Sequence, residues 1–284
     1  MKSSVIKALS EAAHRAALCE VMTSPKPGLV DAFGNGCHED MDCKLFIKSA
    51  EAIAPFWMQQ AQTGAARGEP ARMMQELRAA GVQMERAMLC ATGGVNTHKG
   101  LIYLLSLLVC GAAAAFSAGE YSPRLAAREA ASFAAGSVER ELAPLLTKPR
   151  ARLSNGERLF VEHGVTGARG EAARGFPSVV DSGLPELGAA LLRGAQLNDA
   201  GLSALLSMMG VCEDSNVMHR GGFEYWQNEY RADALAVRAA FDAGFCGYAP
   251  LYAMEARFLP RRISPGGAAD LLSCVYFFNF CSDI

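Results

Sequence analysis

The sequence of 284 residues lacks the excess of positive charge that is common in nucleic-acid-binding proteins. Its 27 lysines and arginines are balanced by 29 acidic residues, which gives a formal net charge of −2. Its nine cysteines are scattered and include no CxxC pair, so neither a disulfide scaffold nor a zinc site is indicated. Composition therefore argues against broad nucleic-acid binding and favours the reduced thiols of a cytoplasmic protein.

The N-terminus lacks the uninterrupted apolar core of a signal peptide, because charged residues interrupt its apolar ones at helical spacing. A different run, residues 100–119, carries no charge over about the 20 residues that span a bilayer. The run is solitary, and its second half is mostly Ala, Gly and Ser. We therefore expect a helix buried on all sides in a soluble bundle, with a membrane helix as the less favoured alternative.

β-Branched residues are sparse, whereas Ala and Leu dominate, a composition that favours helices. Apolar residues recur at i+3 and i+4, as at Val5 and Leu9. Ser122 precedes a proline at a helix start, and Ser154 with Glu157 forms a capping box. Further helices are predicted over about 42–62, 70–90, 97–118, 185–193, 199–212, 223–242, 249–260 and 266–280. The predicted fold is all-α, a single-domain multi-helix bundle over residues 1–284 whose Gly-rich motif loops converge on one nucleotide site.

The segment ATGGVNTHKG, which precedes the long apolar run, is the most informative motif. Its spacing fits neither a Walker loop nor a Rossmann fingerprint. Gly93 and Gly94 let backbone amides approach an anion, and Asn96 or Thr97 can cap the following helix. Lys99 adds its charge to that of the helix N-terminus. The motif predicts a nucleotide phosphate site at a helix start.

Three other regions combine small residues with charge: SPKPGLVDAFGNGCHEDMD at 24–42, GVTGARGEAARGFPSV at 164–179 with EDSNVMHRGG at 213–222, and SPGGAADLL at 264–272. Together with the first motif, and in this order, they resemble the triphosphoribosyl-dephospho-CoA synthase family. The resemblance extends from about Glu20 to the C-terminus. Ala32 stands where the family has a basic residue, which weakens a phosphate role for that loop. His219 falls where the family does not keep histidine, which argues against it as the base.

The resemblance implies that the 2′-hydroxyl of 3′-dephospho-CoA attacks C1′ of the ATP ribose and that adenine departs. The product is a prosthetic-group precursor, passed to a transferase that loads a carrier subunit of citrate lyase or of malonate decarboxylase. Breaking the C–N bond creates an oxocarbenium-like centre, which calls for one carboxylate as base and another as stabiliser. We expect inversion in a single displacement, and Mg²⁺ beside the triphosphate.

Carboxylates of the motifs supply the expected catalytic residues Asp31, Glu171 and Asp214, and Asp31, Asp40 and Asp214 are the expected metal ligands. Simpler roles remain open: Asp40 and Asp42 can cap the next helix, Glu171 can form a solvated ion pair with Arg169 or Arg174, and Asp214 can belong to an ordinary polar turn. If the catalytic interpretation is right, the three carboxylates converge near the helix that starts at residues 96–99. A cation must share such a site, because close carboxylates repel one another.

The expected substrate and phosphate ligands are polar or basic motif residues: Lys26, His38, Asn96, His98, Lys99, Arg169, Asn216 and Arg220. Among them, His38 or His98 can bind phosphate or protonate the departing adenine. A second hypothesis is a non-catalytic protein that binds the nucleotide or delivers the CoA-derived group to the carrier-attaching enzyme. The density of carboxylates favours the enzyme, because binding phosphate alone needs cations and amides.

Overall fold

The computed structural model describes residues 2–244 and 246–284, and within them every regular element is helical, which confirms the all-α prediction. The α-helices are, in chain order, α1 Ser3–Met22, α2 Cys43–Ile53, α3 Trp57–Ala66, α4 Pro70–Thr92, α5 Lys99–Ser117, α6 Pro123–Leu142, α7 Asn155–His163, α8 Gly167–Ala173, α9 Leu184–Leu192, α10 Leu197–Met209, α11 Ser215–Gly221, α12 Phe223–Tyr225, α13 Arg231–Asp242, α14 Ala249–Phe258 and α15 Gly266–Cys281. Short 3₁₀ and π turns connect several of them.

Helices α5 and α15 lie at the centre of the fold. Helix α5 is long and apolar enough to cross a membrane, but 78% of that apolar window is buried inside the protein. It packs against α3, α6 and α15, while α15 also packs against α1 and α10. The chain thus surrounds the uncharged run on nearly all sides, as expected from its composition.

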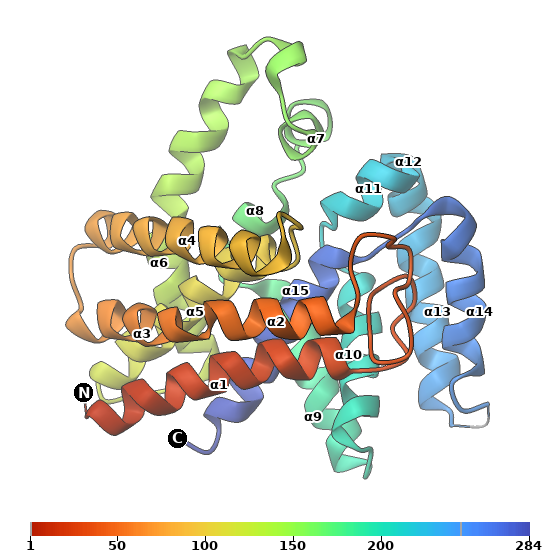
Figure 1. Cartoon of the computed structure of the whole chain (residues 1–284), viewed down its shortest axis with the longest axis horizontal. Helices are drawn as coiled ribbons and strands as arrows, with labels where there is room; N and C mark the ends of the chain where they lie inside the picture. The colour runs from red at the N-terminus through yellow and green to blue at the C-terminus, as the bar shows by residue number, and fades with distance from the viewer. Residues whose placement is uncertain (1, 245) are drawn as a thin grey trace.

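The remaining helices form two groups around this centre (Figure 1). Helices α1 to α4 stack side by side in one group, and α9 to α14 form the other. The end of α6, together with α7, projects from the body as an arm. The arm has its own small apolar cluster, Val138, Leu142, Leu145 and Leu153. One large apolar cluster, which includes residues from Leu9 to Cys281, joins the rest of the chain.

Most helix limits follow the sequence signals. Ser122 accepts a hydrogen bond from the backbone N–H of Leu125, and both hydrogen bonds of the Ser154–Glu157 capping box are present. The helix predicted over 42–62 is α2, a 3₁₀ turn and α3 in direct succession, and the one predicted over 223–242 is α12, a π turn and α13. Capping residues thus marked helix starts correctly, whereas periodicity did not detect breaks within a run.

Two segments expected as Gly-rich ligand loops are helical instead, and this part of the prediction is wrong. Residues of GARGEAARG form α8, and residues of SNVMHRGG form α11. The acidic pair between the two motifs caps both helices. Glu213 accepts from the amides of Thr166 and Gly167 at the start of α8, and Asp214 accepts from those of Asn216 and Val217. Of the two, Asp214 was predicted as a catalytic residue and metal ligand, although capping also explains it.

Candidate active site

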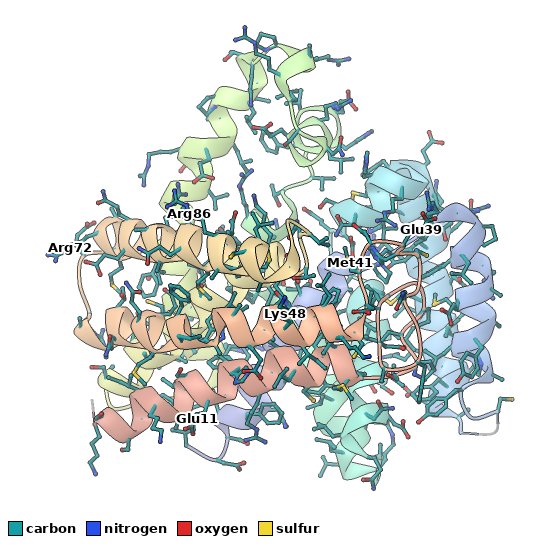
Figure 2. The ribbon with its side chains drawn as sticks, in the orientation of Figure 1. Glu11, Glu39, Met41, Lys48, Arg72 and Arg86 are labelled. Atoms are coloured by element: carbon teal, nitrogen blue, oxygen red, sulfur yellow. The ribbon has the colours of Figure 1, made fainter. Side chains whose placement is uncertain are left out.

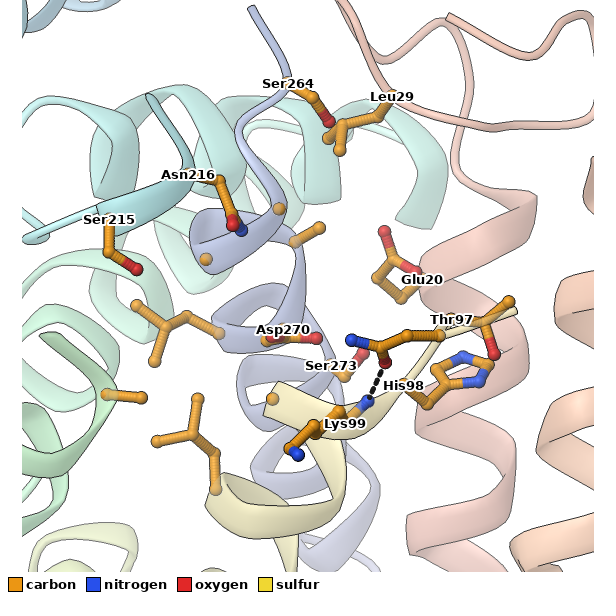
Figure 3. A pocket seen from close by; sticks show the side chains of 18 of the residues that line it. Glu20, Leu29, Thr97, His98, Lys99, Ser215, Asn216, Ser264, Asp270 and Ser273 are labelled. Carbon is orange, nitrogen blue, oxygen red and sulfur yellow. Dashed lines mark hydrogen bonds between the residues drawn. The ribbon is translucent and has the colours of Figure 1, made fainter. Parts of the chain in front are cut away.

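A cavity of about 490 Å³ opens where the first turns of α5 and α15 meet. We call it the carboxylate cavity, because five carboxylates from distant parts of the chain line it: Glu20, Asp40, Glu171, Glu213 and Asp270. Figure 3 shows Glu20, Asp270 and Lys99 around the same space. Only two cationic side chains, those of Lys99 and Arg220, belong to the lining.

Asp270 lies against the first turn of α5. A Cβ atom on Gly100 would lie 2.0 Å from Asp270 Oδ2, so any larger residue at position 100 would displace this carboxylate. Burial raises the pKa of the Asp270 carboxyl well above its usual value; the charges of Glu20 and Asp214 add to this, and the backbone N–H of Leu101 opposes it. A carboxylate with a raised pKa is a stronger base at neutral pH than an exposed one.

Glu20 is held in place by a buried lysine. Lys26 is only 1% exposed, and its ammonium group donates to the carboxylate of Glu20 and, over 2.7 Å, to the carbonyl oxygen of the same residue. Burial raises the pKa of Glu20, and the charge of Lys26 opposes this rise. Lys26, expected to bind phosphate, lies outside the lining of the cavity and is hydrogen-bonded to Glu20 instead.

Glu171 lines the cavity as expected for a catalytic carboxylate. It is 5% exposed, and its two oxygens accept from the backbone N–H and the hydroxyl of Ser178 over 2.7 Å and 3.0 Å. Burial raises the pKa of Glu171, and the hydrogen bonds from Ser178 oppose the rise. Glu171 is too buried for a solvated ion pair with Arg169. Arg169 pairs with Glu141 instead.

The carboxylates of Asp31 and Asp214 accept hydrogen bonds from backbone N–H groups, and neither residue lines the cavity. The carboxylate of Asp31 accepts from the backbone N–H groups of Lys26, Phe33 and Gly34, over 2.7, 2.7 and 3.1 Å. Asp214 caps α11 and also accepts from the N–H of Ala268, at the start of α15. Of the three carboxylates expected to converge, the structure therefore brings only Glu171 to the cavity.

The metal set Asp31, Asp40 and Asp214 is not assembled either. The side chain of Asp40 lines the cavity but is 64% exposed, and the other two carboxylates are occupied by backbone amides. Within residues 2–244 and 246–284, no group of three or more His, Cys, Asp or Glu side chains is arranged to hold a metal ion.

In the ATGGVNTHKG motif, residues 96–100 line the cavity, whereas Gly93 and Gly94 do not. Asn96 Oδ1 accepts from the backbone N–H of Lys99, the first residue of α5, over 3.1 Å, although His98 occupies the N-cap position. Gly93 has a φ of 68° and ends α4, with its N–H bonded to the carbonyl of Leu89. The glycine pair is therefore a helix terminus and does not line the cavity.

His98 is a buried, neutral imidazole. Its Nδ1 lies 2.7 Å from the hydroxyl of Ser49, which in turn accepts from Thr97. Burial, with the charge of Lys26 as a second cause, lowers the pKa of His98 to about 3. A cationic role for His98 toward phosphate or adenine is therefore excluded near neutral pH, and only hydrogen bonding by the neutral ring remains.

The other predicted ligands of the cavity lie at its far wall. His38 contacts the hydroxyl of Ser264 over 2.9 Å, and burial together with the charge of Arg220 lowers its pKa. Arg220 donates to the carbonyl of Arg262 over 2.8 Å, and Asn216 stands beside it on the lining. These side chains place hydrogen-bond donors opposite the start of α5.

Sequence reasoning missed Glu20 as a site residue and did not commit to Asp270. Both had a detectable signal. Glu20 is a charge on the apolar face that α1 forms with Ala13, Ala16 and Ala17. Asp270 is the only charged residue of α15. A single charge in an otherwise apolar helix is costly to bury, so it indicates a function or a partner.

A second pocket, of about 370 Å³, adjoins the carboxylate cavity and shares Lys99, Gly100, Gly167, Ala168 and Ser215 with it. We call it the arginine pocket, because it is lined by Arg78 and Arg169. Of the predicted phosphate ligands, Arg169 lies here and not in the cavity, while Lys99 belongs to both.

Comparison with known proteins identifies the family of the chain. Residues 6–283 match the family described as ATP:dephospho-CoA triphosphoribosyl transferase. The chain is 36% identical to a probable 2-(5″-triphosphoribosyl)-3′-dephosphocoenzyme-A synthase of Streptococcus equi subsp. zooepidemicus, over 99% of this chain and 98% of the relative. The relative of the same name from Streptococcus pyogenes serotype M49 is also 36% identical over the same shares. No solved structure matches. The chain belongs to the ATP:dephospho-CoA triphosphoribosyl transferase family.

Proposed function

We propose that the carboxylate cavity transfers the triphosphoribosyl group of ATP to the 2′-hydroxyl of 3′-dephospho-CoA and releases adenine. The observation that carries the proposal is the position of Asp270, which faces the cavity at the start of α5 and has a raised pKa. The family match over residues 6–283 supplies the two substrates. The cavity supplies the type of chemistry, because glycosidic bonds are cleaved between carboxylates.

The carboxylates divide into two kinds. Glu20 is tied to Lys26, and Glu171 to Ser178, so both are fixed in position. At Asp270, burial raises the pKa of the carboxyl, and only the backbone N–H of Leu101 opposes this rise. We assign Asp270 as the base that accepts the proton of the attacking hydroxyl, and Glu20 and Glu171 as fixed charges that stabilise the oxocarbenium-like centre. The proton of the attacking hydroxyl passes to Asp270 and from there to solvent, and adenine takes one proton from solvent as it leaves, so the reaction balances.

Mg²⁺ is part of this proposal, as a companion of ATP. The five carboxylates of the cavity outnumber its two cationic side chains, so ATP, with about four negative charges, needs a further cation where its phosphates approach the cavity. In proteins Mg²⁺ is commonly held by one or two carboxylates together with substrate phosphates. Asp40 lines the cavity, and its side chain is 64% exposed, as such a contact requires.

The direct test is a chromatographic assay for adenine release from ATP, with and without 3′-dephospho-CoA. The proposal expects stoichiometric adenine that depends on the acceptor, and neither ADP nor pyrophosphate. Stoichiometric ADP would instead indicate a kinase-like reaction and would refute the assignment. Retention of ATP without adenine release would favour the second hypothesis, a protein that binds or delivers the nucleotide without catalysis.

The same proposal places the chain before the enzyme that attaches the prosthetic group to a carrier protein. It also keeps the expected cytoplasmic location. Whether the carrier belongs to citrate lyase or to malonate decarboxylase depends on neighbouring proteins and not on the residues of this cavity.

A further inference from the structure

The arginine pocket collects cations from three helices: Arg78 from α4, Lys99 from α5 and Arg169 from α8. Each is paired with a glutamate. Arg78 and Arg169 share the carboxylate of Glu141, with Arg169 Nε 3.2 Å from Glu141 Oε2, and Lys99 Nζ lies 3.2 Å from Glu85 Oε2. The guanidinium groups of Arg78 and Arg169 therefore both contact the carboxylate of Glu141, near the end of α6.

We propose that the arginine pocket binds the triphosphate arm of ATP, and that Glu141 occupies the place of a phosphate while the pocket is empty. This inference rests on the proposed function. Carboxylate and phosphate oxygens present similar acceptors to guanidinium groups, so Arg78 and Arg169 can exchange one for the other. Their side chains are 47% and 45% exposed, and ion pairs with that much solvent contact are weak. A polyphosphate with several charges displaces such a partner.

Tyr103 adds an independent observation. It follows Lys99 by one turn of α5 and lines the same pocket. Its hydroxyl is buried and has no hydrogen-bond partner in the part of the chain that the structure describes. A buried hydroxyl without a partner is unfavourable, and a phosphate oxygen in the pocket would accept its hydrogen bond.

The shared wall fixes the order of the groups along ATP. Gly100 lines both pockets and touches Asp270, which lines only the carboxylate cavity. A triphosphate in the arginine pocket therefore leaves the ribose at Gly100 and directs C1′ and adenine into the carboxylate cavity. The charges agree with this order, since the arginine pocket has three cations against two carboxylates and the cavity has the opposite balance.

Binding of inorganic tripolyphosphate, titrated calorimetrically without metal, tests the site apart from catalysis. Arg78→Met should weaken binding about tenfold or more, whereas Glu141→Gln should tighten it about threefold, because it removes the internal competitor. A change toward tighter binding cannot come from misfolding. Arg72→Met is the matched control: Arg72 pairs with Glu76 at the far end of α4, outside both pockets, and its change should have no effect (Figure 2).

Steady-state kinetics then separates the two substrates. Arg78→Met and Tyr103→Phe should raise the KM for ATP while the KM for dephospho-CoA stays within about twofold. A rise in the KM for dephospho-CoA alone would assign the pocket to the acceptor and overturn the inference. So would wild-type protein that does not bind tripolyphosphate, or Glu141→Gln that weakens binding, even if adenine release had established the proposed function. Absence of adenine release would refute that function, whatever the tripolyphosphate result.

Discussion

The carboxylate cavity and the arginine pocket share five lining residues, yet their charges are opposite. The difference lies in how each is fixed. Apart from the exposed Asp40, the carboxylates of the cavity are buried or held by hydrogen bonds, as Glu20 is by Lys26, whereas the ion pairs of the arginine pocket are half-exposed and exchangeable. Buried groups with raised pKa values suit proton transfer and charge stabilisation, and exposed cations suit the capture of an anion. The comparison assigns chemistry to one region and substrate binding to the other.

Among variants that leave the catalytic and phosphate-binding side chains unchanged, Gly100→Ala at the shared wall should have the largest effect. Alanine normally favours a helix over glycine, but here its Cβ would lie 2.0 Å from Asp270 Oδ2. The carboxylate must move, and a displacement of about 1 Å can reduce turnover about 100-fold. Adenine release under saturating substrates measures this loss.

Gly81→Ala on α4 is the control, because its Cβ would make only an ordinary contact, 3.9 Å from Ile102. If Gly100→Ala retains full activity, Asp270 does not need its present position, and the role assigned to it fails.

Lys26→Met separates support of the cavity from contact with substrate. It leaves the buried Glu20 without its counter-charge, and breaking a buried pair from one side costs about 3–5 kcal/mol of unfolding free energy. Burial already raises the pKa of Glu20, so the variant should recover stability as the pH falls and Glu20 takes up a proton. Urea unfolding at pH 5 and pH 8 measures the difference. An unchanged unfolding free energy at both values would mean that the pair does not support the cavity.

Lys99→Ala should raise the KM for ATP about tenfold and leave the fold intact, since the lysine side chain is 61% exposed and its pair with Glu85 is weak. Lys48→Ala, on the exposed side of α2, serves as the control (Figure 2). A loss of thermal stability with no change in KM would show that Lys99 has a structural role only.

The smallest expected effect is on stability, in Asp270→Asn. Burial raises the folded-state pKa of Asp270, so the stability that its protonated form contributes is present at low pH and lost as the pH rises through that pKa. The amide has no such charge. The melting temperature of the variant, relative to wild type, should therefore increase from pH 4 to pH 8. A constant difference over this range would mean that Asp270 ionises as an exposed carboxylate does.

Local signals in the sequence predicted the helices well, because caps such as Ser122 and the Ser154–Glu157 box act within a few residues. The same locality explains the failures at the site. Asp31 and Asp214 were expected to bind ligands, but their partners are backbone amides. The amide of Ala268, which Asp214 binds, lies 54 residues away. Only the tertiary structure shows that contact.

Glu20 and Asp270 were missed for a related reason. Both lie in helices whose other residues are mostly apolar, and Asp270 was not chosen as a ligand although it lies within the SPGGAADLL motif. What makes them a site is the meeting of α1, α5 and α15, which periodicity does not encode. The start of α5 was found because Asn96, a hydrogen-bond acceptor for the helix N-terminus, and the cation, Lys99, stand together in one motif.

The most direct test of the division between the two regions is the kinetics of adenine release by Asp270→Asn beside Arg78→Met, with Asp181→Asn as an exposed control outside both pockets. Loss of a general base lowers turnover by about 10²–10⁴-fold. The account predicts that Asp270→Asn loses kcat in this range with little change in the KM for ATP, whereas Arg78→Met raises that KM and retains kcat. If Asp270→Asn retains kcat, or if both variants change the same constant, the separation of chemistry from binding is contradicted.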